Sequence, residues 1–111
     1  MKQALVSYAK GFRVLIGDDH SQAAPMVIET GGKEGGSANR HRGADQWLYL
    51  ESGNGEVRIN GHSYSLTAGS LFLIQRGDRH DLNTGYSPLK TLSFYVPPAY
   101  KVDGDELPRG K

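Results

Sequence analysis

Two polar motifs in the middle of the chain have the residue types and the spacing of a metal or small-molecule site. The first motif reads Asn39-x-His41-x4-Gln46-x6-Gly53. A neutral imidazole is a good ligand for zinc, nickel, copper or iron, whereas an amide oxygen is a weaker, uncharged donor. This short stretch therefore carries one strong and two weak candidate ligands.

The second motif brings another imidazole within reach of the first. It reads Gly69-x7-Gly77-x2-His80. Only residues 54–68 separate the two motifs, enough for one tight hairpin. Because neighbouring antiparallel strands lie about 4.8 Å apart, side chains that are distant in the sequence can meet on one face of a sheet. We therefore expect both imidazoles and both amides to meet around one point.

The elements that must position these side chains are β-strands, because the hydrophobic period is two along nearly the whole chain. Glycine-rich turns separate the short apolar runs. The sharpest turn signal is Asn60-Gly61, since a type I′ hairpin turn needs positive φ at both central residues. No segment has helical periodicity. The predicted strands cover residues 4–8, 12–16, 25–29, 46–51, 56–59, 62–66, 70–75, 80–83 and 89–96.

The strand over residues 46–51 determines which side chains face the pocket. If Gln46 points inward, alternation sends the two leucines of this strand inward and leaves Trp47 and Tyr49 outside. The apolar inward set supports this register. In the alternative register, shifted by one residue, Asp45 would lie inside and restore a carboxylate, but the two aromatic rings would crowd the interior.

Both motifs resemble those of small single-domain cupins, and the resemblance extends over residues 23–100. Against the first cupin motif, G-x5-H-x-H-x3,4-E-x6-G, Asn39 stands at the first histidine, His41 at the second, Gln46 at the glutamate and Gly53 at the final glycine. Spacing is kept, while two of the four ligand identities differ.

The second cupin motif, G-x5-P-x-G-x2-H-x3-N, is matched less completely. Gly69, Gly77 and His80 match, Gln75 replaces the proline, and Asn83 lies one residue early. The resemblance implies an all-β fold, the cupin double-stranded β-helix or jelly-roll barrel. We expect a single domain over residues 1–111, with a loosely packed tail at 101–111.

The resemblance also implies a divalent transition metal, zinc, nickel, iron or manganese, held by His41, Gln46, His80 and Asn39. This set lacks the carboxylate of the two-histidine facial triad, so it should bind the ion less tightly and leave its charge uncompensated. Such a site favours Lewis-acid chemistry on a small anionic oxygenated substrate. His41 and His80 are the expected catalytic residues, with proton transfer by one of them or by a metal-bound water.

Several function classes remain open. The first is a metal-dependent isomerase, lyase or cyclase acting on a sugar acid or a polyketide-like metabolite, because similar small cupins occur among sugar-acid ketonising proteins and in aromatic polyketide synthesis. The second is a non-catalytic, ligand-binding or regulatory dimer without a tightly held metal. The third, a metal-dependent dioxygenase, would need a redox metal, and this ligand set supports it least.

Further side chains are candidates for substrate binding. Arg76 and Arg79 lie in the turn before the second motif's histidine, where a guanidinium could bind a substrate carboxylate, although a solvated surface turn is the alternative. In the last strand Leu92, Phe94 and Val96 are predicted to face the core, and Phe94 and Tyr95 are also candidates to line the pocket. His20 and His62 follow turns and are predicted to be solvated.

Composition excludes other classes of protein. Thirteen Lys and Arg against twelve Asp and Glu give a net charge of +1 without a basic run, so nucleic acid is not an expected partner. There is no cysteine, and no apolar run long enough for a membrane span or a signal peptide. We therefore expect a cytoplasmic protein with no membrane association. An outward stripe of Trp47 and Tyr49 would be covered best by a homodimer interface.

Overall fold

The computed structural model describes residues 1–35, 43–101 and 107. Its strands are β1 (Gly11–Phe12), β2 (Ile16–Gly17), β3 (Gln22–Ile28), β4 (Lys33–Gly35), β5 (Asp45–Ser52), β6 (Asn54–Ile59), β7 (His62–Thr67), β8 (Leu71–Ile74), β9 (His80–Thr84) and β10 (Leu89–Val96). The described residues contain no helix, and so none that is long and apolar enough to cross a membrane.

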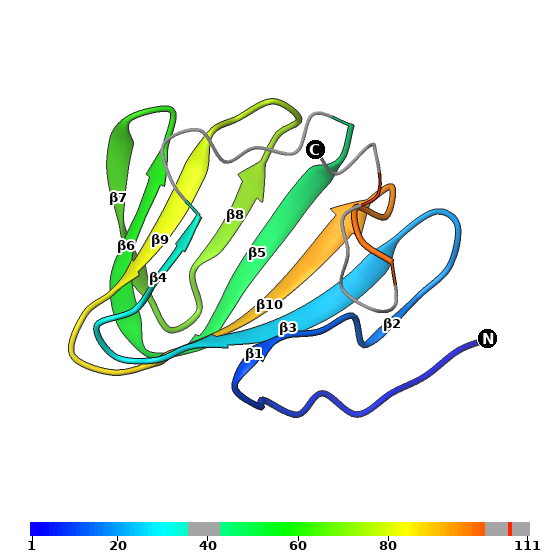
Figure 1. Cartoon of the computed structure of the whole chain (residues 1–111), viewed down its shortest axis with the longest axis horizontal. Helices are drawn as coiled ribbons and strands as arrows, with labels where there is room; N and C mark the ends of the chain where they lie inside the picture. The colour runs from blue at the N-terminus through cyan, green and yellow to red at the C-terminus, as the bar shows by residue number, and fades with distance from the viewer. Residues whose placement is uncertain (36–42, 102–106, 108–111) are drawn as a thin grey trace.

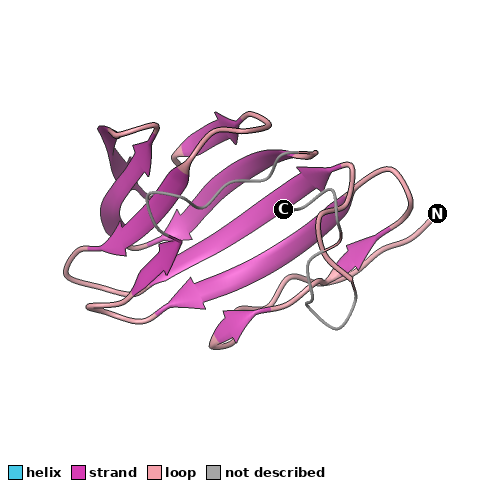
Figure 2. Cartoon of the chain, turned by 45° about the horizontal axis from the view of Figure 1, so that its top comes forward, coloured by secondary structure: helices cyan, strands magenta, loops and turns pink. Residues whose placement is uncertain are grey.

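The strands form two antiparallel sheets that face each other (Figures 1 and 2). The six-stranded sheet has the order β1-β3-β10-β5-β8, with β2 also paired to β3, and the four-stranded sheet has the order β4-β9-β6-β7. Strands that pair in space are thus far apart in the sequence, as β3 and β10 are. This arrangement is that of a jelly-roll barrel, so the predicted all-β fold class is confirmed.

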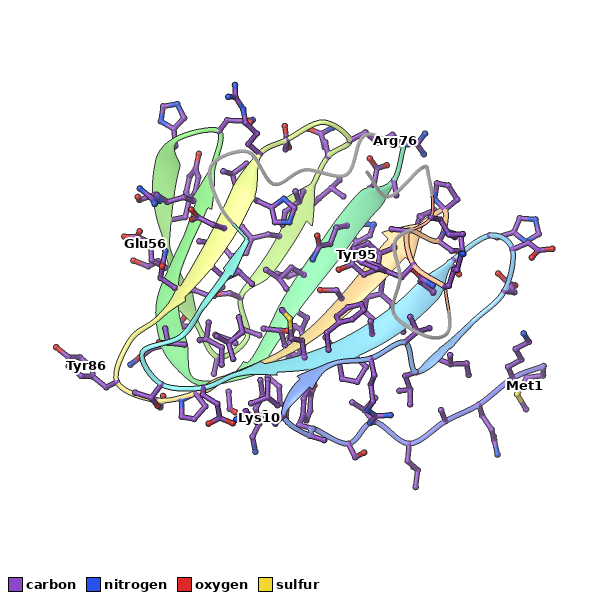
Figure 3. All side chains as sticks on the ribbon, in the orientation of Figure 1. Met1, Lys10, Glu56, Arg76, Tyr86 and Tyr95 are labelled. Atoms are coloured by element: carbon purple, nitrogen blue, oxygen red, sulfur yellow. The ribbon has the colours of Figure 1, made fainter. Side chains whose placement is uncertain are left out.

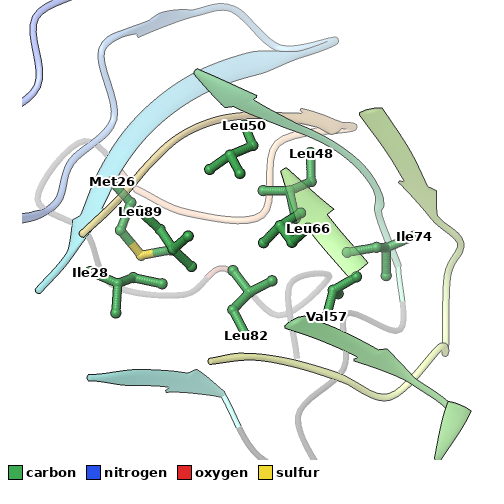
Figure 4. Close-up of a cluster of buried hydrophobic side chains, with 9 residues drawn as sticks. All are labelled: Met26, Ile28, Leu48, Leu50, Val57, Leu66, Ile74, Leu82 and Leu89. Carbon is green, nitrogen blue, oxygen red and sulfur yellow. The ribbon is translucent and has the colours of Figure 1, made fainter. Parts of the chain in front are cut away.

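The main hydrophobic core fills the space between the two sheets (Figure 4). Alternate residues of each strand supply it, as expected from the period of two. Burying one such aliphatic side chain stabilises the fold by about 1.5–3 kcal/mol. The buried members are Met26, Ile28, Leu48, Leu50, Val57, Leu66, Ile74, Leu82 and Leu89.

Strand β5 has the predicted register. Gln46 is buried on the same face as the core leucines of this strand, whereas Trp47 is exposed and Tyr49 is half-buried on the other face. Asp45 is only half-buried. The alternative register, with the carboxylate inside, is therefore wrong.

Two turns explain why particular residues occupy them. Asn60 and Gly61 have φ of 52° and 84°, as the predicted hairpin turn between β6 and β7 requires. Gly53, the last residue of the first motif, has φ of 104°, and a Cβ atom there would overlap the carbonyl oxygen of Pro88. Only glycine fits this position without strain.

The structure corrects three of the strand predictions. Residues 4–8 form no strand, and the stretch 12–16 contributes only parts of β1 and β2. Strand β4 was not predicted at all, because its short polar sequence has no apolar alternation and its extended form comes from pairing with β9. An alternating run such as 4–8 forms a strand only when a sheet edge is available to pair with it.

The phase of strand β10 also differs from the prediction. Leu92, Phe94 and Val96 face outward or are half-buried, while Thr91 and Ser93 are buried on the inner face with Leu89 and Tyr95. Thr91 can be buried because its hydroxyl donates to the carbonyl oxygen of Met26 at 3.1 Å. Satisfied hydroxyls can occupy an interior, so polarity alone gave the wrong face. Of the tail expected to be loose, residues 102–106 and 108–111 lie outside the described part.

Candidate functional site

One end of the barrel gathers Gln46 of the first motif and Gly77 and His80 of the second. Gln46 near the start of β5 pairs with Tyr95 near the end of β10, and His80 at the start of β9 pairs with Ile59 at the end of β6. The β8–β9 turn lies at the same end, where Figure 3 places Arg76, and Tyr86 lies at the opposite end. We call this end the rim.

Gln46 presents an unpaired oxygen to the interior. The residue is only 4% exposed, and its amide nitrogen donates a hydrogen bond to Ser93 Oγ at 3.0 Å. Its buried Oε1 has no hydrogen-bond partner in the described part of the chain. An acceptor left unpaired in an interior costs about 1–3 kcal/mol. This position therefore suits a donor or a cation that the described residues do not provide.

His80 enters the interior from the facing sheet. It is 7% exposed and shares the inner face of β9 with the core residue Leu82. Its Nδ1 lies 3.4 Å from the carbonyl oxygen of Asp78, a contact that suits the tautomer with the proton on Nδ1. In that tautomer Nε2 carries the lone pair that a metal needs.

The other two predicted ligands, Asn39 and His41, lie outside the described residues. The structure therefore places Gln46 and His80, from facing sheets, at one end of the barrel and does not test the remaining pair. Within residues 1–35, 43–101 and 107, no three His, Cys, Asp or Glu residues gather as a metal-binding group. The available donors at the rim are instead an imidazole nitrogen and an amide oxygen, and these uncharged donors fit a weakly held divalent ion.

Two neighbours of Gln46 lie outside the sequence motifs: Tyr95, a candidate pocket residue from the sequence, and Ser93, which the sequence did not indicate. Ser93 holds the amide, as described, and Tyr95 is 4% exposed, with its ring 5.1 Å from that of Tyr100 in an edge-to-face contact. Both follow from the inward phase of β10, which the sequence alone had reversed. Ser93 contacts Gln46 through this hydrogen bond, and Tyr95 is the register partner of Gln46 across β10 and β5.

The acidic residues at the rim are turned away from the interior. Asp45 Oδ1 lies 3.4 Å from Arg76 Nε and also accepts a hydrogen bond from the Arg76 backbone at 3.0 Å. Asp81 pairs with Arg58 on the adjacent strand through two nitrogen–oxygen contacts of 3.3 Å each. The hydrogen bond and the charge of Asp81 raise the pKa of Arg58. Neither carboxylate is available to balance a cation beside Gln46.

The two arginines predicted to bind substrate lie in different surroundings. Arg76 is held by Asp45 on the outer side of β5. Arg79 instead lines a cavity of about 220 Å³ together with Arg58, Asn60, Gly61, His80 and Asp81. The structure thus separates Arg76 from Arg79 and places Arg58 beside Arg79, although Arg58 belongs to neither sequence motif.

Phe94 does not face the interior, contrary to the prediction. It is 40% exposed and pairs with Trp47 across the outer face of the six-stranded sheet. The exposed members of this outer apolar face are Trp47, Leu71, Leu73, Phe94 and Val96. His20 and His62 are exposed, as predicted.

The chain is similar in sequence to one protein family and in structure to several solved proteins. The family model Cupin_2, described as a cupin domain, matches residues 25–95. No curated protein matches the chain. Among solved structures, the Bacillus halodurans protein BH2720 has a TM-score of 0.72 and 29% identity, covering 92% of this chain and 76% of that one.

Two further structures are less similar in sequence. KdgF from Halomonas sp. has a TM-score of 0.72 and 18% identity over 78% of this chain and 77% of its own. Ectoine synthase from P. lautus has a TM-score of 0.62 and 19% identity over 71% of this chain and 55% of its own. At these identities the likeness concerns the fold.

Proposed function

Because this chain belongs to the cupin family, we propose that it binds a divalent transition metal (zinc, nickel, iron or manganese) at the rim and acts on a small anionic oxygenated metabolite. Gln46 and His80 are the described ligands in this proposal, and Asn39 and His41 complete the set. The substrate class is a sugar acid or a polyketide-like acid, and the reaction is of the isomerase, lyase or cyclase type.

The unpaired Oε1 of Gln46 is the observation that carries the proposal. A buried acceptor without a partner is uncommon, because most buried polar atoms are hydrogen-bonded. Ser93 fixes the amide from its nitrogen side, so the oxygen is directed elsewhere. An ion beside this oxygen would remove the cost of leaving it unpaired.

The polar groups at the rim would have separate roles in this reaction. A bound ion would supply Lewis acidity to polarise a carbonyl or carboxylate. Ser93 orients the Gln46 amide, and the Asp78 carbonyl orients the His80 ring. Because Asp45 and Asp81 are paired outside with arginines, an anionic substrate would balance the charge at the rim. We assign proton transfer to one of the two motif histidines, His41 or His80.

Metal titration of untagged, chelator-treated protein tests this proposal. We expect calorimetry to give one saturable zinc or nickel site in the parent protein and its loss in His80→Ala. His62→Ala is the matched control, because it removes an exposed histidine. Equal metal affinity in the parent and both variants would contradict the proposal, provided that circular dichroism shows His80→Ala to be folded.

The outer apolar face favours a homodimer, either of the enzyme or of a non-catalytic ligand-binding protein. Trp47 is 41% exposed and pairs with Leu73 on one side and Phe94 on the other, so the apolar surface is continuous across three strands. A monomer seldom leaves such a patch in water. The face is on the side of the sheet opposite the core, so a second copy could cover it without blocking the interior.

Sedimentation tests the dimer separately from the metal. We expect a dimer at micromolar concentration for the parent protein and a monomer for Trp47→Asp. Tyr86→Asp is the control, because Tyr86 is 96% exposed in a turn at the opposite end of the barrel. A parent protein that sediments as a monomer would defeat this part of the proposal.

A further inference from the structure

Asn60 connects the β6–β7 turn to the β8–β9 turn at the rim by hydrogen bonds. Its backbone nitrogen donates to the carbonyl oxygen of Arg79 at 2.8 Å, and its side-chain oxygen accepts from the Arg79 backbone at 2.9 Å. Its side-chain nitrogen donates to Asp78 Oδ1 at 2.9 Å. The β6–β7 and β8–β9 turns therefore form one frame, and residues that project from it are held at fixed positions.

Arg58 and Asp81 form an ion pair next to this frame, in which only the carboxylate is buried. They are direct partners across β6 and β9. Since their neighbours Val57 and Leu82 belong to the core, alternation places the pair on the outer face of the four-stranded sheet. The Asp81 side chain is 3% exposed and that of Arg58 is 45% exposed. The carboxylate thus fixes one edge of the guanidinium, while the rest of the group reaches the surface.

Arg79 adds a second guanidinium that no described residue neutralises. Its side chain makes no hydrogen bond or ion pair within residues 1–35, 43–101 and 107, and it lines the cavity of about 220 Å³ with Arg58. The cavity walls therefore carry two positive groups against the one carboxylate of Asp81. Glu56 precedes Arg58 by two residues on β6, so alternation puts it on the same outer face, and its charge also helps to raise the pKa of Arg58, but it does not line the cavity. The Asp78 side chain is occupied by Asn60 and the backbone of Gln75.

We propose that this cavity is an anion site that binds the carboxylate of a small organic acid between Arg58 and Arg79. Planar guanidinium groups suit carboxylates because they can donate two parallel hydrogen bonds. The volume of about 220 Å³ is below the range of about 300–1,000 Å³ for sites that enclose larger ligands, so it suits one small acid or the acidic end of a longer molecule. Asp81 acts as a positioning residue for Arg58.

This site is distinct from the proposed metal site in the barrel. Arg58 and Asp81 point away from the interior, whereas Gln46 points into it. His80 is the residue common to both, because it begins β9 between the inner face and the cavity. The anion site requires no metal and can be tested without one.

Binding of two probe anions to chelator-treated protein tests the proposal. Titration with glucuronate, followed by backbone amide NMR, should give saturable shifts at the Asn60–Gly61 turn and at Arg79. We expect Arg79→Ala to weaken binding at least about tenfold, the loss typical of one charge-assisted hydrogen bond. Arg76→Ala is the matched control and should bind like the parent, since Arg76 is held by Asp45.

Arg58 needs a paired substitution, because Arg58→Ala alone would leave a buried carboxylate without its partner. The double variant Arg58→Ala, Asp81→Asn removes both charges and should also weaken glucuronate binding at least about tenfold. Equal weakening in the Arg76→Ala control would overturn the proposal, because it would indicate general attraction by surface charge. Saturable binding of inorganic phosphate without binding of glucuronate would overturn the carboxylate assignment. Because the anion titration contains no metal, a negative result would not contradict the proposed metal site. Likewise, a negative metal titration would not contradict the proposed anion site.

Discussion

Replacing Gln46 with glutamate changes one buried oxygen donor from neutral to charged and so tests the chemistry of the interior directly. Gln46 is 4% exposed, and the described residues place no cation beside its unpaired oxygen. In metal-free protein we therefore expect burial to raise the pKa of the new carboxyl above its unfolded value of about 4.3. A rise of about two pKa units corresponds to about 3 kcal/mol.

The sign of the pH dependence follows from that direction. Below about pH 3 the carboxyl is protonated in both the folded and the unfolded states, so Gln46→Glu adds no charge penalty there. As the pH rises, the unfolded state loses its proton first, and the folded state loses stability relative to it. The free energy of unfolding of the metal-free variant should thus fall by about 3 kcal/mol by neutral pH, relative to the parent protein.

A divalent ion should reverse this loss if Gln46 is a ligand. An ion at a hundredfold excess over its dissociation constant stabilises the folded state by about 2.7 kcal/mol, which is nearly the whole penalty. The carboxylate should also bind zinc more tightly than the amide does. Urea unfolding of the parent and the variant, with and without zinc and at several pH values, measures both effects.

Gln46→Met is the control, because it keeps the length of the side chain and removes its polar atoms. Zinc should stabilise Gln46→Glu more than the parent, and the parent more than Gln46→Met. Equal stabilisation of all three would refute the assignment of Gln46 as a ligand. Absence of any pH-dependent loss in metal-free Gln46→Glu would refute the claim that this side chain lies in a dry interior.

Three further predictions concern the fold. Gly53→Ala should lower the free energy of unfolding by about 1–3 kcal/mol, because φ of 104° and the Pro88 carbonyl leave no place for a Cβ atom. Urea unfolding measures this loss, and an unchanged midpoint would show that alanine fits this position without strain. Leu48→Ala should lower the free energy of unfolding by about 2–5 kcal/mol, because Leu48 is a fully buried core residue. A calorimetric melting temperature within error of the parent would contradict the placement of Leu48 in the core. Hydrogen bonds from the backbone nitrogens of His20 and Ser21 lower the pKa of Asp18 below its ordinary 3.8, so stability from this group is present above that pH and is lost as the pH falls. Carboxyl NMR should give Asp18 a lower titration midpoint in the folded protein than in the unfolded chain, and equal midpoints would contradict the prediction.

The sequence was sufficient to predict a feature where local geometry permits only one arrangement of the residues. A positive φ at two consecutive turn residues is accessible to Asn60-Gly61, so the hairpin could be predicted. The alternation around Gln46 could be predicted because only one register keeps Trp47 out of the core. The spacing of the two motifs, including Gly53, was enough to predict the family and the jelly-roll fold.

Tertiary contacts determined what local rules leave open. The alternation of residues along β10 defines two faces but does not say which face is inside. The inner face was determined by the hydrogen-bond partners of the Thr91 and Ser93 hydroxyls, which come from other strands. Likewise Arg76 and Arg79 are equivalent in the sequence, and only the position of Asp45 across the sheet holds Arg76 away from the cavity that Arg79 lines.

The sequence by itself therefore determined most of the strands, the Asn60-Gly61 turn, the fold class and the two motifs, because each has a signal in residues close together in the chain. The tertiary structure alone decided that Gln46 Oε1 lies buried without a described partner, and that Arg58 joins Arg79 beside His80. Burial and charge pairing depend on which strands become neighbours, and that is settled by how the two sheets pack together rather than by any one segment.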